Sequence, residues 1–289
     1  RHRDALLVVT MQESRLLSNY PMLFGLRGGN SRVAYWGHGR NFQSVRPRGV
    51  RERWKRMLVD KVDWWFAYTD TTRDILLGDG YPDERITVLD NAIDNEEFER
   101  ELAAVSPEQQ AARLREIAAD DGSPVGLFCG SLYPDKRLDY MVAAADLIHA
   151  AIPGFRLVVI GDGPSAGIVE EAARSRPWLR WVGARTGREK AEWFAVADVV
   201  INPGAVGLHI LDSFCSGAPM ITTRDSKHGP ELAYLHSGLN GLIVDGDAEA
   251  YAAAVIALLR DSPRLDALKR AALADARRYT LENMVNRFA

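Results

Sequence analysis

The stretch Asn202–Thr222 combines a tight turn with the start of an apolar helical pattern, and such a stretch can bind a phosphate group. It follows the apolar, β-branched run Asp198–Ile201, which has the length of a buried parallel strand. The chain then turns at Gly204, and a new apolar periodicity begins at Gly207. In a doubly wound sheet such a loop lies at the carboxyl end of a strand, where free N–H groups and the helix dipole hold anions. We therefore expect any bound nucleotide to place its diphosphate here.

Two further glycine-bearing turns directly follow strand-like runs. The first, Gly130–Arg137, contains Lys136, which could reach a diphosphate at Gly207 if both strands end at the same crevice. The alternative is a solvated lysine at the start of a helix. The second, Gly161-Asp162-Gly163, matches a dinucleotide fingerprint only loosely, because Gly-x-Gly is usually just a tight turn. Three such loops in one domain favour a nucleotide-binding crevice.

Composition predicts a soluble globular protein. The 289 residues suffice for two domains, and 47% hydrophobic with 26% charged residues can form a core. A net charge of -3 argues against a nucleic-acid partner, and no apolar run reaches the roughly 18 residues of a membrane span. The opening residues read as a strand, not as a signal peptide. Cys129 and Cys215 lack metal-ligand spacing and fit a reducing cytoplasm.

The first third of the chain, residues 1–93, alternates short β-type runs with helical patterns, which predicts a parallel sheet. The expected strands are Ala5–Thr10, Arg32–Trp36, Trp65–Thr69 and Ile86–Leu89, and the expected helices are Arg15–Leu26, Arg51–Val62 and Thr71–Gly78. Four strands are fewer than the five or six of a complete doubly wound domain. We therefore expect residues 1–93 to form a partial Rossmann-like domain.

The rest of the chain, residues 94–289, reads as a full α/β domain that follows a crossing near Asp94. A charged helical segment, Asn95–Ala119, is interrupted by Pro107. The expected strands are Val125–Cys129, Arg156–Ile160, Leu179–Val182, Asp198–Ile201, Met220–Thr223 and Gly241–Val244. The expected helices are Asp139–Ala151, Ser165–Arg174, Arg188–Ala195, His209–Ser216, Ala248–Arg260 and Pro263–Arg278.

These motifs together resemble a known family. They are Gly130–Lys136, Val159–Pro164, Trp181–Gly183, Ala197–Val199, Gly207–Asp212, Gly217–Pro219, Pro230-Glu231 and Asn240–Leu242. In order and spacing they resemble the C-terminal domain of the retaining glycosyltransferases of family 4, which have the GT-B fold. Trp36–Gly39 and Val88–Asp94 resemble the acceptor-side His-Gly segment and the hinge of the same family. The resemblance implies an α/β GT-B fold, with two Rossmann-like domains facing across a cleft and the first of them incomplete.

The resemblance also implies an activity and its residues. A sugar would pass from a nucleotide diphosphate sugar to a glycan or lipid-linked acceptor, with retention of configuration. The expected catalytic residues are His38, which would face the donor sugar, and Lys136, which would neutralise the diphosphate. The N–H groups of Gly207, Leu208 and His209 would bind that same diphosphate.

The remaining donor contacts follow from the same resemblance. Asp212, Gly183 and Arg185 would bind the nucleoside. The donor loops would contain Gly130, Ser131, Gly161, Gly163 and Gly204. No metal and no other cofactor is expected, because lysine, arginine and a helix N-terminus supply the positive charge that the leaving diphosphate needs.

Three departures from the family pattern bear on activity. The family usually carries Glu-x7-Glu over the phosphate loop, whereas this chain has Gly204 at the first position and the shorter Asp212 at the second. The family commonly has an arginine directly after the first glycine of the loop, whereas this chain has Ser131 after Gly130. Arg137 or Arg185 could substitute for that arginine. The first domain also begins partway through the family pattern.

A basic segment, Arg46–Trp65, interleaves cationic and apolar side chains and ends in two tryptophans. It could rest on an anionic membrane that carries the acceptor, at the inner face of the membrane, or it could be a solvated helix that packs one face in the core. Among the histidines, His38 lies between two glycines that would leave its ring exposed, and His209 and His228 are weaker ligand candidates.

The leading hypothesis is a two-domain GT-B hexosyltransferase. A GT-B sugar-nucleotide epimerase is an alternative that would need no acceptor. A phosphorylase would need a lysine-bound pyridoxal cofactor, to which nothing in the sequence points. A third alternative is a catalytically silent nucleotide-sugar-binding protein, which Gly204 and the short first domain favour.

Overall fold

The chain forms two compact units. The computed structural model describes residues 5–12, 17, 19–25, 31–39 and 57–289. The first unit comprises Arg1–Ala92, Gly229–Ala233 and Leu281–Ala289, and the second comprises Ile93–His228 and Tyr234–Thr280. The first division lies one residue from the boundary expected at 93/94. Residues 229–233 and 281–289 belong to the first unit, whereas the sequence places them in the second domain.

The first unit contains a parallel sheet of four strands. Its order is β1-β2-β3-β4, with bounds Leu7–Met11, Arg32–Gly37, Trp64–Ala67 and Ile86–Val88. Helices α1 (Asn19–Gly25) and α3 (Asp70–Gly78) and the short 3-10 turns η1 (Val59–Lys61) and η2 (Asp83–Arg85) also belong to its described part. The expected helices Arg15–Leu26 and Arg51–Val62 fall partly outside the described residues.

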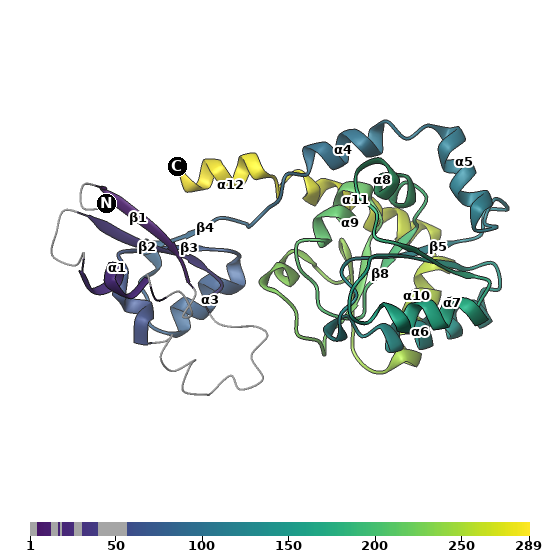
Figure 1. The fold of residues 1–289 in the computed structure, drawn as a ribbon, viewed down its shortest axis with the longest axis horizontal. Coiled ribbons are helices and arrows are strands. Elements are labelled where there is room, and N and C mark those ends of the chain that lie inside the picture. Colours follow the sequence, from purple (N-terminus) through teal and green to yellow (C-terminus); the bar gives the residue numbers. More distant parts are fainter. Residues whose placement is uncertain (1–4, 13–16, 18, 26–30, 40–56) are drawn as a thin grey trace. The chain divides into compact units, whose positions relative to one another are not determined.

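Helix α12, Leu281–Phe288, belongs to this first unit although it ends the chain (Figure 1, yellow). The Phe288 ring stacks on Phe66 with 4.4 Å between centroids and lies 5.8 Å from the Trp36 ring. Arg287 forms an ion pair of 2.7 Å with the buried Asp90. The sequence analysis did not predict α12, because its partners are about 200 residues away in the chain and leave no local pattern.

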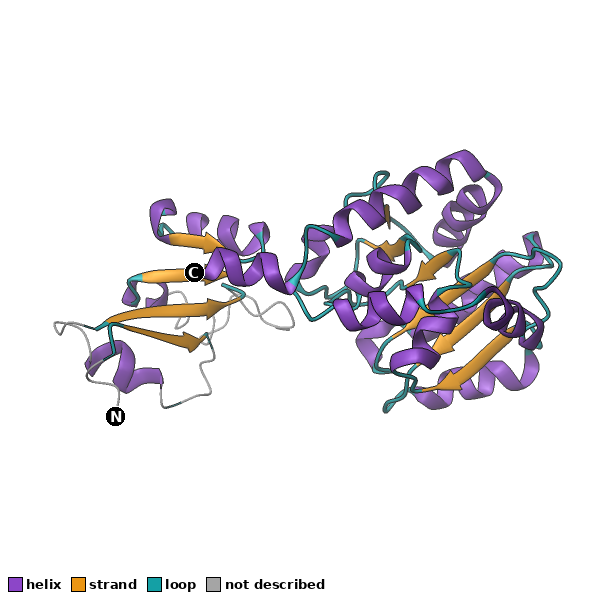
Figure 2. Ribbon diagram, turned by 90° about the horizontal axis from the view of Figure 1, so that it is seen from above, coloured by secondary structure: helices purple, strands orange, loops and turns teal. Residues whose placement is uncertain are grey.

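The second unit is a doubly wound domain with six parallel strands in the order β10-β9-β8-β5-β6-β7. The bounds are β5 Val125–Cys129, β6 Arg156–Ile160, β7 Leu179–Gly183, β8 Val199–Ile201, β9 Met220–Thr223 and β10 Gly241–Val244. Figure 2 shows these strands as neighbouring arrows with a common direction. If β5 to β10 are numbered 1 to 6 and the sheet is read from β7 to β10, the strand order is 3-2-1-4-5-6. This is the order of dinucleotide-binding domains. The α/β prediction is confirmed.

Helices cover both faces of this sheet. They are α4 Glu96–Ala103, α5 Pro107–Glu116, α6 Leu138–Ala151, α7 Ala166–Ser175, α8 Gly187–Phe194, α9 Ile210–Ser216, α10 Ala248–Arg260 and α11 Ser262–Ala276. Helices α6, α7 and α10 lie on one side and α8, α9 and α11 on the other (Figure 1). The segment expected as one interrupted helix is two helices, because Pro107 starts α5 and Ser106 caps it with Gln109.

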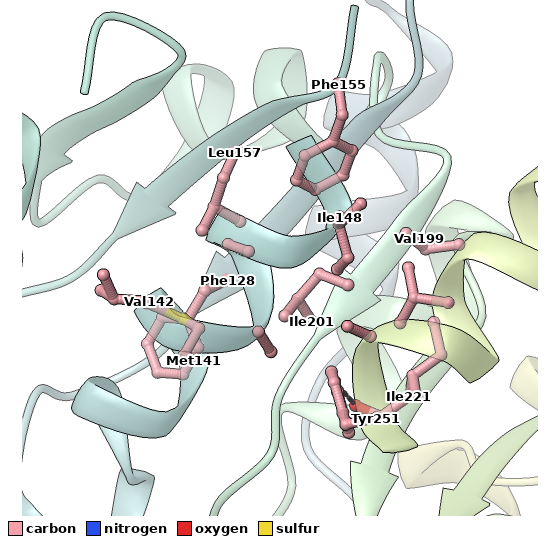
Figure 3. Packing of buried hydrophobic residues seen from close by; sticks show 14 of the residues in the cluster. Phe128, Met141, Val142, Ile148, Phe155, Leu157, Val199, Ile201, Ile221 and Tyr251 are labelled. Carbon is pink, nitrogen blue, oxygen red and sulfur yellow. Dashed lines mark hydrogen bonds between the residues drawn. The ribbon is translucent and has the colours of Figure 1, made fainter. Parts of the chain in front are cut away.

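The core of the second unit holds the central strands in place. Phe128 of β5, Ile201 of β8 and Ile221 of β9 are fully buried and lie close together (Figure 3). Tyr251 of α10 is buried with them and donates a hydrogen bond of 2.6 Å from its Oη to the Ile221 carbonyl. Each such side chain stabilises the fold by about 1.5–3 kcal/mol. This packing fixes the positions at which β5 and β8 end.

Candidate functional site

The candidate site lies at the carboxyl ends of β5 and β8. These neighbouring strands mark the point where the strand order reverses, since β6 and β7 continue on one side and β9 and β10 on the other. Ligands of doubly wound domains bind in the crevice at this switch point. The loop after β5 contains Lys136, and the loop after β8 contains Gly204 and Gly207. The topology therefore brings together two of the loops that the sequence predicted to converge.

Lys136 ends the 3-10 turn η3, Pro134–Lys136, and only 3% of its surface is exposed. Its Nζ donates a hydrogen bond of 2.6 Å to the Ala205 carbonyl and lies 3.4 Å from His209 Nε2. Burial lowers the pKa of the ammonium to about 8. The alternative of a solvated lysine is therefore wrong, and Lys136 joins the two loops.

The loop after β8 packs tightly against the turn that carries Lys136. A Cβ atom at Gly204 would lie 2.4 Å from the backbone of Lys136, so this position has no room for any side chain. The Ala205 N–H donates a hydrogen bond of 2.8 Å to the Asp135 carbonyl. The glycine at the first motif position is thus required by the close approach of two backbones.

His228 holds the other side of the same loop. Its Nδ1 accepts a hydrogen bond of 3.2 Å from the Val206 N–H, and its Nε2 lies 2.7 Å from the Thr223 carbonyl. These partners require a neutral ring with the proton on Nε2. Burial lowers the pKa of His228, which favours that form. This histidine, a weak ligand candidate by sequence, positions the loop.

Gly161 and Gly163 support the loop after β5. Their φ angles are 144° and 152°, and a Cβ at either position would meet the backbone of Gly130 or Leu132 at 1.9 and 2.5 Å. The Leu132 N–H donates a hydrogen bond of 2.8 Å to the Asp162 carbonyl. The Gly-x-Gly turn therefore lets two backbone segments pack closely at Gly130 and Leu132, as a tight turn would.

Gly207, Leu208 and His209 precede helix α9 and are half-buried. Across the described part of the chain, no backbone carbonyl accepts a hydrogen bond from the N–H groups of these three residues. The carbonyls of Gly207 and Leu208 accept hydrogen bonds from the N–H groups of Ile210 and Leu211, at 3.1 and 3.0 Å. The three donors thus remain available for an anion.

Asp212 lies on α9 and is paired with a residue that the sequence analysis missed. Lys190 of α8 places its Nζ 2.7 Å from Asp212 Oδ1 and 4.4 Å from the centre of the Phe98 ring. Burial raises the pKa of the Asp212 carboxyl, and the Lys190 charge opposes this shift. A buried carboxylate at this position calls for a nearby cation, but no sequence pattern identifies which lysine supplies it.

Three other predicted residues lie on loops after β7 and β5. Gly183 ends β7 with a φ of 73°, and Arg185, two residues on, is exposed. The Arg185 guanidinium donates to the Ala184 carbonyl at 2.9 Å and approaches Glu189 at 3.3 Å. Ser131 is exposed on the loop after β5.

Arg137, a candidate to replace the missing arginine at position 131, contacts groups at the end of β9 and in α6. Its Nη1 donates hydrogen bonds to Thr223 Oγ1 at 3.0 Å and to the Asp225 carbonyl at 2.8 Å. Its guanidinium also lies 4.3 Å above the Tyr140 ring. Arg137 therefore ties the start of α6 to the strand end of β9, and its substitution for the missing arginine stays a prediction.

His38 belongs to the first unit, where it follows β2. Its ring is half-buried, with its centroid 4.1 Å from that of Tyr68. The two flanking glycines therefore do not leave the ring fully exposed, because Tyr68 packs against it.

Most of the basic segment Arg46–Trp65 lies outside the described residues. Its last residue, Trp65, is fully buried in β3 and donates a hydrogen bond of 3.1 Å to the Val59 carbonyl, so it cannot contact a membrane. The helices among the described residues are too short or too polar to cross a membrane. The same residues contain no cluster of three or more histidine, cysteine, aspartate or glutamate side chains suited to a metal ion.

Part of the chain matches a known protein family. Residues 123–261 match the family described as glycosyl transferases group 1. A D-inositol 3-phosphate glycosyltransferase of Thermobispora bispora is 29% identical over 252 residues, which are 80% of this chain and 55% of the relative. A GDP-mannose-dependent alpha-mannosyltransferase of Mycobacterium tuberculosis is 29% identical over 58% of this chain and 41% of its own length. The chain spans about half the length of these relatives.

Solved structures agree on the fold. HepE of Anabaena, solved in complex with UDP, gives a TM-score of 0.77 at 14% identity, covering 99% of this chain and 78% of that one. A sucrose-phosphate synthase of Thermosynechococcus elongatus gives 0.74 at 18% identity over 99% and 73%. The fold is that of the GT-B glycosyltransferases. The match to the group 1 glycosyltransferase family covers residues 123–261.

Proposed function

We propose that the chain is a hexosyltransferase that moves a sugar from a nucleotide diphosphate sugar to a glycan or lipid-linked acceptor with retention of configuration. The observation that carries this proposal is the buried Lys136, whose ammonium lies at the switch point between β5 and β8. A buried cation beside unpaired backbone donors suits a diphosphate. The names of the relatives support sugar-nucleotide chemistry, since one is GDP-mannose-dependent and one neighbour was solved with UDP.

In this proposal the bond between the sugar and the diphosphate breaks as the acceptor hydroxyl attacks from the same face, and the hydroxyl proton passes to the departing diphosphate. Lys136 and the N–H groups of residues 207–209 stabilise the negative charge that grows on the departing diphosphate. Asp212 would bind the ribose, and Gly183 and Arg185 would bind the base. His38 is the second catalytic residue in this proposal. No metal and no further cofactor is required.

A thermal-shift panel of nucleoside diphosphates and their sugar conjugates tests donor binding. A ligand at about 100 times its Kd should stabilise the protein by about 2.7 kcal/mol, which raises its Tm by several degrees. Turnover of the best donor is then compared in Lys136→Ala and in Lys61→Ala, whose ammonium pairs with Asp60 in the first unit. Lys136→Ala should reduce turnover more than it weakens nucleotide binding. Lack of stabilisation by every nucleotide, or intact turnover in Lys136→Ala, would reject the proposal.

A second candidate is a catalytically silent nucleotide-sugar-binding protein. Gly204 favours it, because the first motif carboxylate is absent and the backbone of Lys136 leaves no room for one. This candidate predicts thermal stabilisation by the nucleotide sugar with no donor consumed in the presence of any acceptor extract. Product analysis separates it from the hexosyltransferase.

A further inference from the structure

His209 and Lys136 form a side-chain pair that the proposed chemistry has not yet used. The distance from Lys136 Nζ to His209 Nε2 is 3.4 Å, and the same ammonium donates to the Ala205 carbonyl at 2.6 Å. An ammonium group can only donate hydrogen bonds, so His209 Nε2 must accept. His209 is therefore neutral in this arrangement and carries its proton on Nδ1.

The surroundings of His209 favour its neutral form. The charged and titratable groups that act on it are Lys136 from the loop after β5, Lys190 from α8 and His228 from the loop after β9. Its own helix carries Asp212, whose charge is paired with Lys190 at 2.7 Å. Burial and these neighbours lower the pKa of His209 well below its ordinary value. A negative charge added beside His209 would raise its pKa again and favour the protonated ring.

We propose that His209 is the second cationic residue of the diphosphate site, and that it takes up one proton from solvent when a nucleotide sugar binds. The inference rests on the proposed function. Protonation forms one N–H bond at Nε2 and changes no other covalent bond. It removes the lone pair to which Lys136 donates, so two N–H donors 3.4 Å apart then face each other. A phosphate oxygen between them can accept from both, which makes the pair a clamp for an anion.

The rest of the site explains why a second cation is needed there. Position 131 is a serine, and Arg137 is engaged by Thr223 and Asp225. The Lys190 charge is paired with Asp212. Among the described residues around the loop after β8, His209 is thus the group that can add a positive charge beside Lys136.

Isothermal titration calorimetry measures the proton directly. GDP-mannose and UDP-glucose are titrated into the full chain at pH 7.0 in PIPES, MOPS and imidazole, whose ionisation enthalpies differ. The diphosphate of these ligands is a diester without a titration near neutral pH, and Lys136, with its pKa of about 8, is already mostly charged. The dependence of the observed enthalpy on buffer should show uptake of about 0.5–1 proton per ligand.

Three variants assign the proton. His209→Gln should abolish the uptake and weaken binding about 10- to 100-fold, as expected for loss of one charge-assisted hydrogen bond. His209→Arg carries a permanent charge and should recover much of the affinity without proton uptake. His236→Gln changes an exposed histidine whose backbone hydrogen bonds go to Leu239 and Asn240, and it should leave both quantities unchanged.

The outcomes separate the two proposals. Binding of a donor without proton uptake, or with an uptake that His209→Gln does not reduce, rejects the role of His209 and leaves the proposed function standing. Failure of both sugar nucleotides and of the whole thermal-shift panel to bind rejects both proposals.

Discussion

The Lys190 ammonium lies 2.7 Å from the Asp212 carboxylate, and this ion pair joins helices α8 and α9 beside the switch point of the sheet. The Asp212 side chain is 8% exposed and that of Lys190 is 20% exposed. Lys190 also lies over the Phe98 ring of α4, so three helices meet at one charge. Lys190 therefore neutralises the buried carboxylate at the second motif position.

Removal of Lys190 should destabilise the second unit. Lys190→Met keeps the bulk of the side chain but leaves a buried carboxylate without its cation, which we expect to cost about 1–3 kcal/mol. Urea unfolding at pH 7 measures the loss. The matched double variant Lys190→Met/Asp212→Asn should lose less than the sum of the two single variants, because the unpaired charge is then absent.

The Lys190–Asp212 pair should also make the stability loss in Lys190→Met depend on pH. Burial already raises the pKa of Asp212, and loss of Lys190 should raise it further. A raised folded-state pKa gives stability that is present at low pH and is lost as the pH rises through that pKa. The deficit of Lys190→Met should therefore shrink on acidification. A deficit that stays constant between pH 7 and pH 4 would contradict the assigned pairing.

Gly204 should tolerate no substitution. In Gly204→Ala the new Cβ would lie 2.4 Å from the Lys136 backbone, so one of the two loops must move. We expect a loss of about 1–3 kcal/mol, as for other overpacked sites, together with weaker nucleotide binding. Gly167→Ala in α7 is the matched control, because a Cβ there meets no atom within 4 Å and should be neutral or stabilising.

Restoring the family carboxylate with Gly204→Glu should fail for the same reason. We expect this variant to be less stable than Gly204→Ala and to gain no transferase activity, since the loop that carries position 204 cannot keep its place. A well-folded Gly204→Glu protein with increased turnover would show that the backbone contact yields easily.

The sequence predicted most strands and the two converging loops because local signals specify them. Apolar β-branched runs such as Val125–Cys129 determine buried strands, and Pro203-Gly204 determines a turn. The sequence did not predict contacts between distant segments. The pairing of Lys190 with Asp212, the return of α12 to the first unit and the lack of space at Gly204 all depend on tertiary packing.

Lys136 should give the protein a stability that increases at alkaline pH. Its folded-state pKa of about 8 lies below the ordinary lysine value, so the unfolded chain binds the proton more tightly. Stability should therefore rise between about pH 8 and pH 10.5, by up to about 3 kcal/mol relative to Lys136→Met. Urea midpoints of both proteins across this range provide the measurement. Parallel pH profiles for the two proteins would mean that Lys136 is not buried as a charge.

Binding of the diphosphate should change in the opposite sense. Because the anion needs the charged ammonium, donor affinity should fall above pH 8 by up to about tenfold per pH unit. Lys136→Arg keeps its charge in this range and should show a flatter profile, although with weaker binding at pH 7 because its planar head does not reproduce the ammonium geometry. A profile for Lys136→Arg as steep as that of the unchanged protein would assign the titration to another group.

Arg137 combines an unfavourable backbone conformation with favourable side-chain contacts, and two substitutions separate them. Its φ of 56° and ψ of 49° are left-handed, which costs a non-glycine residue about 1 kcal/mol. Arg137→Ala keeps this strain and loses the bonds to Thr223 and Asp225, whereas Arg137→Gly loses the same bonds but relieves the strain. Both should be less stable than the unchanged protein in urea, with glycine about 1 kcal/mol better than alanine. Arg185→Ala, on an exposed loop, should stay within about 0.5 kcal/mol of the unchanged protein. If alanine and glycine at position 137 proved equally stable, the start of α6 would have to relax out of the left-handed conformation once the arginine contacts are lost.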